Sequence, residues 1–154
     1  MSAEERVQKL KLELPSAPSP MATYRPSVRV GDILYVSGTG PFRHDGSVIK
    51  GKVGVDLGVE QAYEAARLVG LNVLSTLRAA LGSLDKVVRI VKVLGFVNAT
   101  LDFEEQPRVI NGFSDLMVEV FGEETGKGGR SAVGMGSLPQ NIPVEVEAIF
   151  QVTD

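Results

Sequence analysis

The segment KVVRIVKVLGFVNA, residues 86–99, constrains the fold more than any other stretch of this chain. It is rich in β-branched residues and contains no glycine or proline before Gly95, which predicts a central β-strand. Successive side chains of a strand point to opposite faces of the sheet. The alternation gives two apolar sets, Val88, Ile90, Leu94 and Phe96 on one face and Val91, Val93 and Val97 on the other. A strand that is apolar on both faces is buried on both, so the fold must cover each face of this strand.

Two amphipathic helices can cover one of these faces. Apolar residues recur at three- and four-residue steps from about Val59 to Leu81, and Gly82 follows at the position where a glycine commonly ends a helix. A second helical pattern covers residues 103–121, with Pro107 near its start. The chain offers only these two long helices. We therefore expect the second face of the strand to meet another subunit.

Shorter β-rich segments complete the predicted sheet. Two strands, 27–30 and 33–37, flank Gly31-Asp32, which is typical of a hairpin turn. Further strands are predicted at 47–53, 130–138 and 144–152, and the glycine-rich segment 122–129 predicts a loop. The resulting order, β-β-β-α-β-α-β-β, predicts helices layered on one sheet. It contains no internal repeat, so we expect a single domain spanning residues 1–154.

The first residues predict an extension ahead of this core. Ser2 and Glu5 match the S-x-x-E capping box, which indicates a short helix over residues 3–11. The segment PSAPSP, residues 15–20, predicts an extended linker because proline fixes φ and cannot donate a backbone hydrogen bond. Residues 1–19 are therefore interpreted as an N-terminal helix and a proline-rich linker.

Charge and composition exclude several classes of function. The net charge is -3 and the 16 Lys and Arg residues are dispersed, so we expect neither a nucleic acid nor a membrane as partner. Without cysteine there can be no disulfide, thiol nucleophile or thiolate metal site. The first residues lack the apolar core of a signal peptide, and no apolar run approaches the roughly 18 residues of a membrane span. These features predict a cytoplasmic protein.

Two patterns resemble cofactor motifs but lack their required residues. In GEETGKGG, Gly122 and Gly126 are separated by three residues, and Gly128 stands where a phosphate loop needs Ser or Thr. His44 is the only histidine and lies in a polar turn, away from other metal-ligating residues. We therefore expect no metal site and no cofactor.

Arg130 is the strongest candidate for a ligand-binding residue. Its neighbours are small and uncharged: Gly128, Gly129, Ser131 and Ala132. A surface arginine at the start of a strand is the simpler interpretation. However, the glycines would let a ligand approach the backbone, and a guanidinium is well matched to bidentate capture of a carboxylate. Arg130 therefore predicts a site for a small carboxylate-bearing molecule.

The last strand, PVEVEAIFQV at residues 143–152, carries carboxylates opposite its apolar face. Its apolar face consists of Val144, Val146, Ala148, Phe150 and Val152, and Glu145, Glu147 and Gln151 point the other way beside Ile149. A solvated polar face would explain this alternation. A carboxylate in a partly closed cleft could instead orient or activate a water molecule.

These segments together resemble the Rid/YjgF family of reactive intermediate deaminases. The family signature has an arginine at a strand start, then Leu-Pro, then an Ile/Val-Glu strand, matched here by Arg130, Leu138-Pro139 and VEVEAI (144–149). Upstream, YVSGTGP (35–41) resembles the family's Ser-Gly segment, Tyr24 matches its pocket-mouth tyrosine and Asn111 matches the asparagine of its second helix. The resemblance covers about residues 20–152.

The resemblance implies an α+β, chorismate-mutase-like fold in which two long helices cover one face of a mixed sheet, here with a short N-terminal helix added. It also implies a homotrimer with ligand clefts between subunits. Active members hydrolyse enamines and imines such as 2-aminoacrylate to 2-keto acids and ammonia. By resemblance, Arg130 binds the substrate carboxylate and Glu145 helps to hold the attacking water. The implied substrate-binding residues are Tyr24, Ser37, Gly38, Asn111 and Ala132.

Departures from the family pattern leave other functions open. Gly128-Gly129 precedes Arg130 where typical deaminases carry Pro-Ala, and Ala132 replaces a cysteine of several deaminases. With the extended N-terminus and the long 122–129 loop, these features indicate a divergent, longer subgroup. One alternative is a non-catalytic trimer that binds 2-keto acids. Another is the endoribonuclease or translation-inhibitor role often attached to the family, for which this acidic chain offers no cluster of cations.

Overall fold

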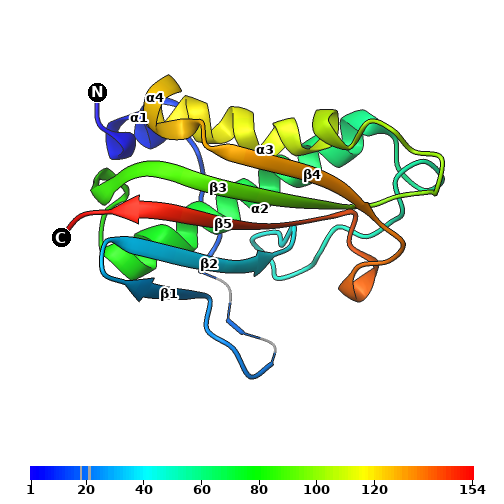
Figure 1. Ribbon diagram of the computed structural model, residues 1–154, viewed down its shortest axis with the longest axis horizontal. Coiled ribbons are helices and arrows are strands. Elements are labelled where there is room, and N and C mark those ends of the chain that lie inside the picture. Colours follow the sequence, from blue (N-terminus) through cyan, green and yellow to red (C-terminus); the bar gives the residue numbers. More distant parts are fainter. Residues whose placement is uncertain (18, 21) are drawn as a thin grey trace.

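The computed structural model describes residues 1–17, 19–20 and 22–154, so Pro18 of the predicted linker lies outside the described residues. The helices are α1 (Ala3–Lys9), α2 (Val59–Leu81), α3 (Gln106–Phe121) and α4 (Glu123–Gly126), with short 3-10 turns at Leu84–Lys86 and Pro139–Asn141. The strands are β1 (Ser27–Val30), β2 (Ile33–Thr39), β3 (Val87–Asn98), β4 (Gly129–Met135) and β5 (Val144–Val152) (Figure 1).

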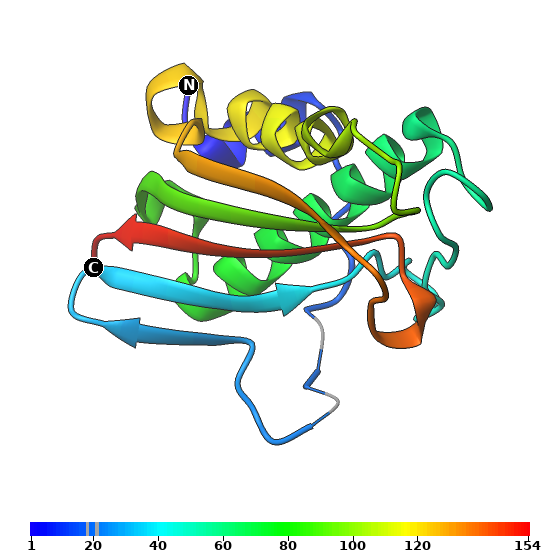
Figure 2. The ribbon, with the colours of Figure 1, turned by 45° about the vertical axis from the view of Figure 1, so that its right-hand side comes forward.

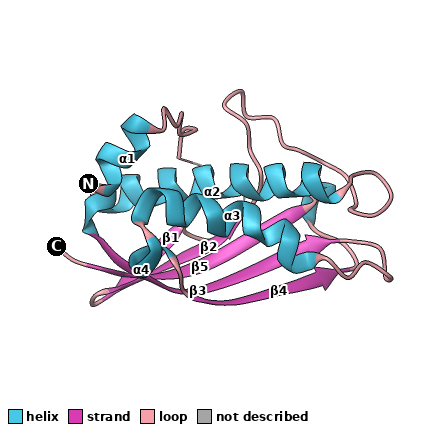
Figure 3. Ribbon diagram, turned by 90° about the horizontal axis from the view of Figure 1, so that it is seen from above, coloured by secondary structure: helices cyan, strands magenta, loops and turns pink. Residues whose placement is uncertain are grey.

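The strands form one mixed sheet in the order β1-β2-β5-β3-β4. β3 and β4 run parallel, and the other neighbouring pairs are antiparallel. The long helices α2 and α3 lie on one face of this sheet and leave the other face open (Figure 3). Figure 2 shows β4 at the edge nearest α3 and β1 at the opposite edge. The α+β fold with two long helices on one face is thus confirmed.

The two long helices approach each other closely through glycines. A Cβ on Gly112 of α3 would lie 2.0 Å from the carbonyl oxygen of Tyr63 in α2, and a Cβ on Gly70 would lie 2.7 Å from the side chain of Leu116. The absence of a side chain at these positions lets the helix backbones meet, so α2 and α3 form one layer over the sheet.

The N-terminal helix packs onto this layer. The predicted capping box is present, because Ser2 Oγ accepts from the Glu5 amide and Glu5 accepts from the Ser2 amide. Glu4 accepts a hydrogen bond of 2.6 Å from Arg78 at the end of α2, and Val7 is buried in the core. The helix ends at Lys9, two residues earlier than expected.

The alternation of β5 follows the prediction. Its buried residues are Val144, Val146, Ala148, Phe150 and Val152, all on the helix-covered face. Glu145, Ile149 and Gln151 are half-buried and Glu147 is exposed on the other face. The regular pairing of β5 with β3 over Val93–Val97 preserves this period of two.

The predicted faces of β3 were wrong in the first half of the strand. Register shifts between Val87 and Arg89 and between Ile90 and Lys92 change the alternation against β5. Ile90 consequently joins Val93 and Val97 in the core. Each shift acts as a bulge, which places an extra residue opposite one partner residue and moves the following side chains to the other face.

Other predicted boundaries differ for local reasons. Residues 47–53 form isolated bridges and no strand, since Gly51 adopts a φ of 135° that interrupts an extended chain. α3 begins at Gln106 because the Phe103 amide first closes a turn onto Thr100. The predicted 122–129 loop contains the short helix α4, and β4 ends at Met135 before the predicted boundary.

Candidate functional site

Arg130 projects from edge strand β4 towards α3. Its Nη1 donates to Asn111 Oδ1 at 2.8 Å and to Ser114 Oγ at 3.2 Å, and its Nη2 lies 3.4 Å from the Pro107 carbonyl oxygen. All three acceptors are uncharged. Among the residues that the structure describes, no carboxylate forms an ion pair with Arg130. The guanidinium is therefore oriented without being neutralised, which suits it to an anionic ligand.

A cavity of about 270 Å³ borders Arg130. Asn111, Ser114, Lys127 and Gly128 contribute to its lining. Lys127 brings a second cation, although it pairs with Glu123. The sequence analysis identified Asn111 but missed Ser114. The spacing of three residues on one helix was the available signal, because it puts both side chains on the same face of α3.

The glycines before Arg130 have different structural roles. A Cβ on Gly128 would lie 2.8 Å from the Ile90 carbonyl oxygen, so close packing against β3 requires this glycine. A Cβ on Gly129 would meet its nearest atom at 3.5 Å, an ordinary contact. The expectation that both glycines open the backbone to a ligand was therefore wrong for Gly128, whose place is set by packing.

Glu145 lies on the open face of the sheet, between the buried residues Val144 and Val146. A Cβ on Gly38 would lie only 2.1 Å from Glu145 Oε1, so the carboxylate occupies the space that a side chain on β2 would fill. Burial raises the pKa of Glu145, and the charge of neighbouring Glu147 raises this pKa further. Glu145 thus holds a proton more readily than an ordinary glutamate. A group that exchanges protons during a reaction works best when its pKa is close to the pH of the solution.

Three further predicted site residues surround Glu145. A hollow of about 600 Å³ is lined by Tyr24, Ser37, Gly38 and Glu145, with Gln140 also on its wall. Ser37 Oγ donates to the Arg25 carbonyl oxygen at 2.5 Å, which ties β2 to the segment that carries Tyr24. The structure therefore brings Glu145 of the last strand together with three residues of the first forty positions.

The predicted site residues form two groups within one chain. Arg130 and Asn111 lie together at the β4 edge, and Glu145 lies with its partners across the sheet on the other face. Ala132 pairs with Gly95 and packs its side chain against the core, so only its backbone is available to a ligand. No group of acidic or histidine side chains able to hold a metal occurs in the described part of the chain.

A family model now adds independent information. The model described as YjgF/chorismate_mutase-like, putative endoribonuclease, matches residues 4–147. The chain belongs to the YjgF family.

YjgF relatives cover nearly the whole chain. Protein TCP17 of Trypanosoma cruzi is 43% identical over 148 residues, which are 96% of this chain and 92% of that protein. A 2-iminobutanoate/2-iminopropanoate deaminase of Dermatophagoides farinae is 29% identical, over 92% of this chain and 94% of its own. The sequence resemblance to the Rid/YjgF family is thereby confirmed.

Solved structures resemble this one to different extents. An Agrobacterium tumefaciens protein with unknown function is 41% identical and superposes with a TM-score of 0.88, covering 98% of this chain and 94% of its own. A "putative endoribonuclease" from Shewanella oneidensis is 31% identical and superposes with a TM-score of 0.93, covering 99% of this chain and 100% of its own. RidA from a Psychrobacter species is 25% identical and superposes with a TM-score of 0.64, covering 89% of this chain and 94% of its own. The first two therefore share most of the N-terminal extension.

The structure also bears on the membrane expectation. Within residues 1–17, 19–20 and 22–154, every helix is too short or too polar to cross a membrane.

Proposed function

We propose that this YjgF protein hydrolyses small 2-imino acids to 2-keto acids and ammonia at a site shared by two copies of the chain. The proposal is based on the hydrogen bonding of the Arg130 guanidinium. Three uncharged acceptors orient this group, and no described carboxylate forms an ion pair with it. A guanidinium of this kind matches the carboxylate that every 2-imino acid bears. The name of the Dermatophagoides farinae relative supports this substrate class.

The reaction needs little beyond positioning. Water adds to the electrophilic imine carbon and gives a tetrahedral carbinolamine. This intermediate expels ammonia as the C–N bond breaks and the carbonyl forms. Glu145 accepts one proton from the attacking water and passes it to the imine nitrogen, and it then carries the hydroxyl proton of the carbinolamine to the same nitrogen, which leaves as ammonia; its raised pKa favours this exchange. Arg130 holds the substrate carboxylate throughout, so the imine carbon stays beside the water.

Two copies are part of the proposal because one chain separates these groups. The open sheet face carries exposed apolar side chains, including Val28, Tyr35 and Val133. Such a face favours contact with a second copy. In a homotrimer, the β4 edge of one subunit would lie against the Glu145 hollow of the next, so the trimer would contain three equal sites.

Mixed oligomers provide the sharpest test. Arg130→Ala and Glu145→Gln should each be inactive in ammonia release from dehydratase-generated 2-aminoacrylate. Co-refolded at equal amounts, they should recover about a quarter of wild-type activity, since random assembly of a head-to-tail ring gives that share of sites with both native residues. Recovery would not occur if one chain supplied both groups.

Ligand binding tests the alternative of a non-catalytic trimer. Isothermal titration with 2-ketobutyrate should detect binding that Arg130→Ala abolishes. Binding by wild type without ammonia release would contradict the deaminase and favour a sensor of 2-keto acids.

A further inference from the structure

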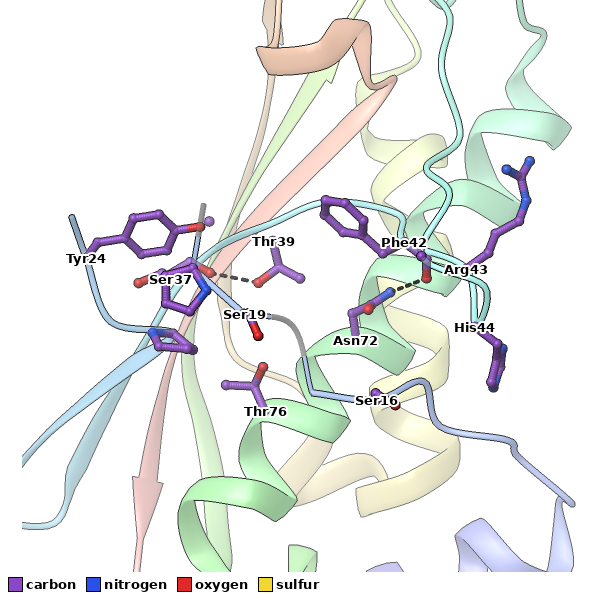
Figure 4. A pocket seen from close by; sticks show the side chains of 15 residues that line it. Ser16, Ser19, Tyr24, Ser37, Thr39, Phe42, Arg43, His44, Asn72 and Thr76 are labelled. Carbon is purple, nitrogen blue, oxygen red and sulfur yellow. Dashed lines mark hydrogen bonds between the residues drawn. The ribbon is translucent and has the colours of Figure 1, made fainter. Parts of the chain in front are cut away.

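The hollow around Glu145 has one wall from the N-terminal half of the chain and a second wall from the turn that precedes β5. Short-range hydrogen bonds fix the first wall. Ser37 Oγ donates to the Arg25 carbonyl oxygen. Thr39 Oγ1 donates to the Ser37 carbonyl oxygen at 2.8 Å (Figure 4). The first wall is thus held by bonds within residues 25–39.

The second wall is the turn between β4 and β5, from which Pro139, Gln140 and Ile142 line the hollow. Its backbone is unusual, because Gln140 and Asn141 are both left-handed, with φ of 57° and 56°. A residue with a side chain adopts this conformation at a cost in free energy, and it persists where surrounding contacts impose it. The turn therefore depends on contacts with other segments to keep its shape.

Asn98, the last residue of β3, makes two such contacts. Its side-chain nitrogen donates to Asn141 Oδ1 at 3.0 Å and to the Ile142 carbonyl oxygen at 3.1 Å. β3 lies between β4 and β5 in the sheet, so the connection that joins those two strands crosses the end of β3. Asn98 is completely buried at this crossing, and its remaining polar atom, Oδ1, also needs a partner.

Lys52 supplies that partner. Its Nζ donates to Asn98 Oδ1 and to the Gly136 carbonyl oxygen, each at 2.6 Å. Gly136 directly follows β4, so one ammonium group joins the start of the connection to the asparagine that holds its end. Lys52 is half-buried and forms no ion pair with a described carboxylate. Its charge therefore strengthens hydrogen bonds to two uncharged oxygens.

Backbone hydrogen bonds hold the segment around Lys52 at the same crossing. The Gly51 amide donates to the Asn141 carbonyl oxygen at 2.8 Å, and the Val53 amide donates to the Asn98 carbonyl oxygen at 2.8 Å. These bonds do not involve the side chain of Lys52. A substitution at Lys52 should therefore leave the fold intact and act on the turn.

We infer that Lys52 is a positioning residue of the proposed catalytic site, which fixes, through Asn98 and Gly136, the turn that walls the hollow around Glu145. For its effect on turnover, this inference rests on the proposed function. A wall of fixed shape keeps the attacking water beside Glu145, and such positioning is the main requirement of the proposed reaction. The substrate carboxylate binds Arg130, which does not line this hollow. Lys52 should therefore affect kcat and leave KM nearly unchanged.

Lys52→Met tests the inference in ammonia release from 2-aminoacrylate by the full-length protein. Methionine has a similar length and removes both hydrogen bonds. We expect kcat to fall about tenfold, the factor for loss of one hydrogen bond, with KM within about twofold of wild type. Lys52→Arg keeps a cationic donor and should recover most of kcat. Lys50→Met changes an exposed lysine two residues earlier and should turn over as wild type does.

A double variant shows whether Lys52 and Asn98 act together. Asn98→Leu keeps a similar volume and removes the bonds to the turn, so its kcat should also fall about tenfold. The combination of Lys52→Met with Asn98→Leu should fall by about the same factor, because both changes release one turn. A fall of about a hundredfold would mean that the two residues act independently and would overturn the inference.

The pKa of Glu145, measured by NMR titration of its carboxyl carbon, provides a readout that needs no turnover. Burial is the first cause of the rise in this pKa and the charge of Glu147 is the second. Lys52→Met should lower the pKa of Glu145, because a released turn admits water to the hollow. Lys50→Met should leave it unchanged.

Two outcomes would overturn the inference: an unchanged kcat of Lys52→Met in an active enzyme, or an unchanged pKa of Glu145 in this variant. A lower melting temperature with neither change would identify Lys52 as a structural residue only. Wild-type protein that releases no ammonia would contradict the proposed deaminase activity. In that case the pKa of Glu145 in Lys52→Met would still decide whether Lys52 positions the turn.

Discussion

Arg130 and Glu145 lie on opposite faces of the same sheet. Arg130 pairs with Val93 of β3, whose side chain is in the core, and Glu145 pairs with Phe96, whose side chain points the other way. Two strand spacings, about 10 Å, also separate β4 from β5. One small ligand cannot contact both side chains of the same chain. We therefore expect a shared site to form only when chains associate.

Replacing the arginine should remove ligand binding while preserving the fold. A guanidinium makes two charge-assisted hydrogen bonds to a carboxylate, each contributing about 1.5–3 kcal/mol. Arg130→Ala should therefore weaken 2-ketobutyrate binding about a hundredfold or more by isothermal titration. Arg130→Lys should recover little, because an ammonium lacks the planar fork.

Arg29→Ala is the matched control for this substitution, since Arg29 pairs with the fully exposed Asp154 and lies far from β4 in the sheet. It should bind as wild type does. Unfolding of Arg130→Ala would instead identify Arg130 as a structural residue of the contact between β4 and α3.

Glu145→Gln should separate turnover from binding. The amide keeps the shape of the side chain but cannot accept a proton from water. We expect near-normal 2-ketobutyrate affinity with kcat lowered about a hundredfold or more, as for loss of a general base. Glu104→Gln, an exposed carboxylate in the segment before α3, serves as control and should keep its kcat. Equal turnover by both variants would leave Glu145 as part of a solvated strand face.

The raised pKa of Glu145 predicts a pH dependence of stability. Burial is the first cause of the rise and the charge of Glu147 is the second. The folded protein then binds this proton more tightly than the unfolded chain, so stability is lost as the pH rises through the raised pKa. Glutamine cannot ionise. Glu145→Gln should therefore melt at a higher temperature than wild type near pH 7 and at the same temperature below about pH 4. A difference in melting temperature that stays constant from pH 4 to pH 7 would contradict a raised pKa of Glu145.

The open sheet face predicts association. Light scattering at micromolar concentration should give about three times the 16.5 kDa mass of one chain. Tyr35→Glu places a charge on this face, where Tyr35 is 48% exposed in the single chain, and should lower the mass. Val55→Glu makes a similar change in a loop and should not lower it. A monomeric wild type would exclude the shared site.

The contact between α2 and α3 predicts a sensitive glycine. Gly112→Ala would force a methyl group into the Tyr63 carbonyl oxygen, which lies 2.0 Å from the Cβ position. Such overpacking costs about 1–3 kcal/mol or more, and the melting temperature should fall by at least about 3 °C. Gly136→Ala is the control, because no atom lies within 4 Å of its Cβ position. A normal melting temperature for Gly112→Ala would mean that the helices can move apart without cost.

Local patterns in the sequence determined several elements directly. The period of two in residues 144–152 specified both the strand β5 and its buried face, because no bulge disturbs its pairing with β3 over Val93–Val97. The Gly31-Asp32 hairpin and the capping box of Ser2 follow equally from neighbouring residues. Arg130 and Glu145 were chosen as candidates because each charge stands among small or apolar residues, and their roles stay predictions.

Tertiary structure alone decided how these parts meet. The bulges of β3 arise from pairing with β5, so counting along β3 could not assign Ile90 to the core. Gly128 is needed for packing against a strand some forty positions earlier in the chain, a contact that its own neighbours do not reveal. Periodicity assigns a residue to a face of its own element, but which elements lie opposite that face depends on long-range packing.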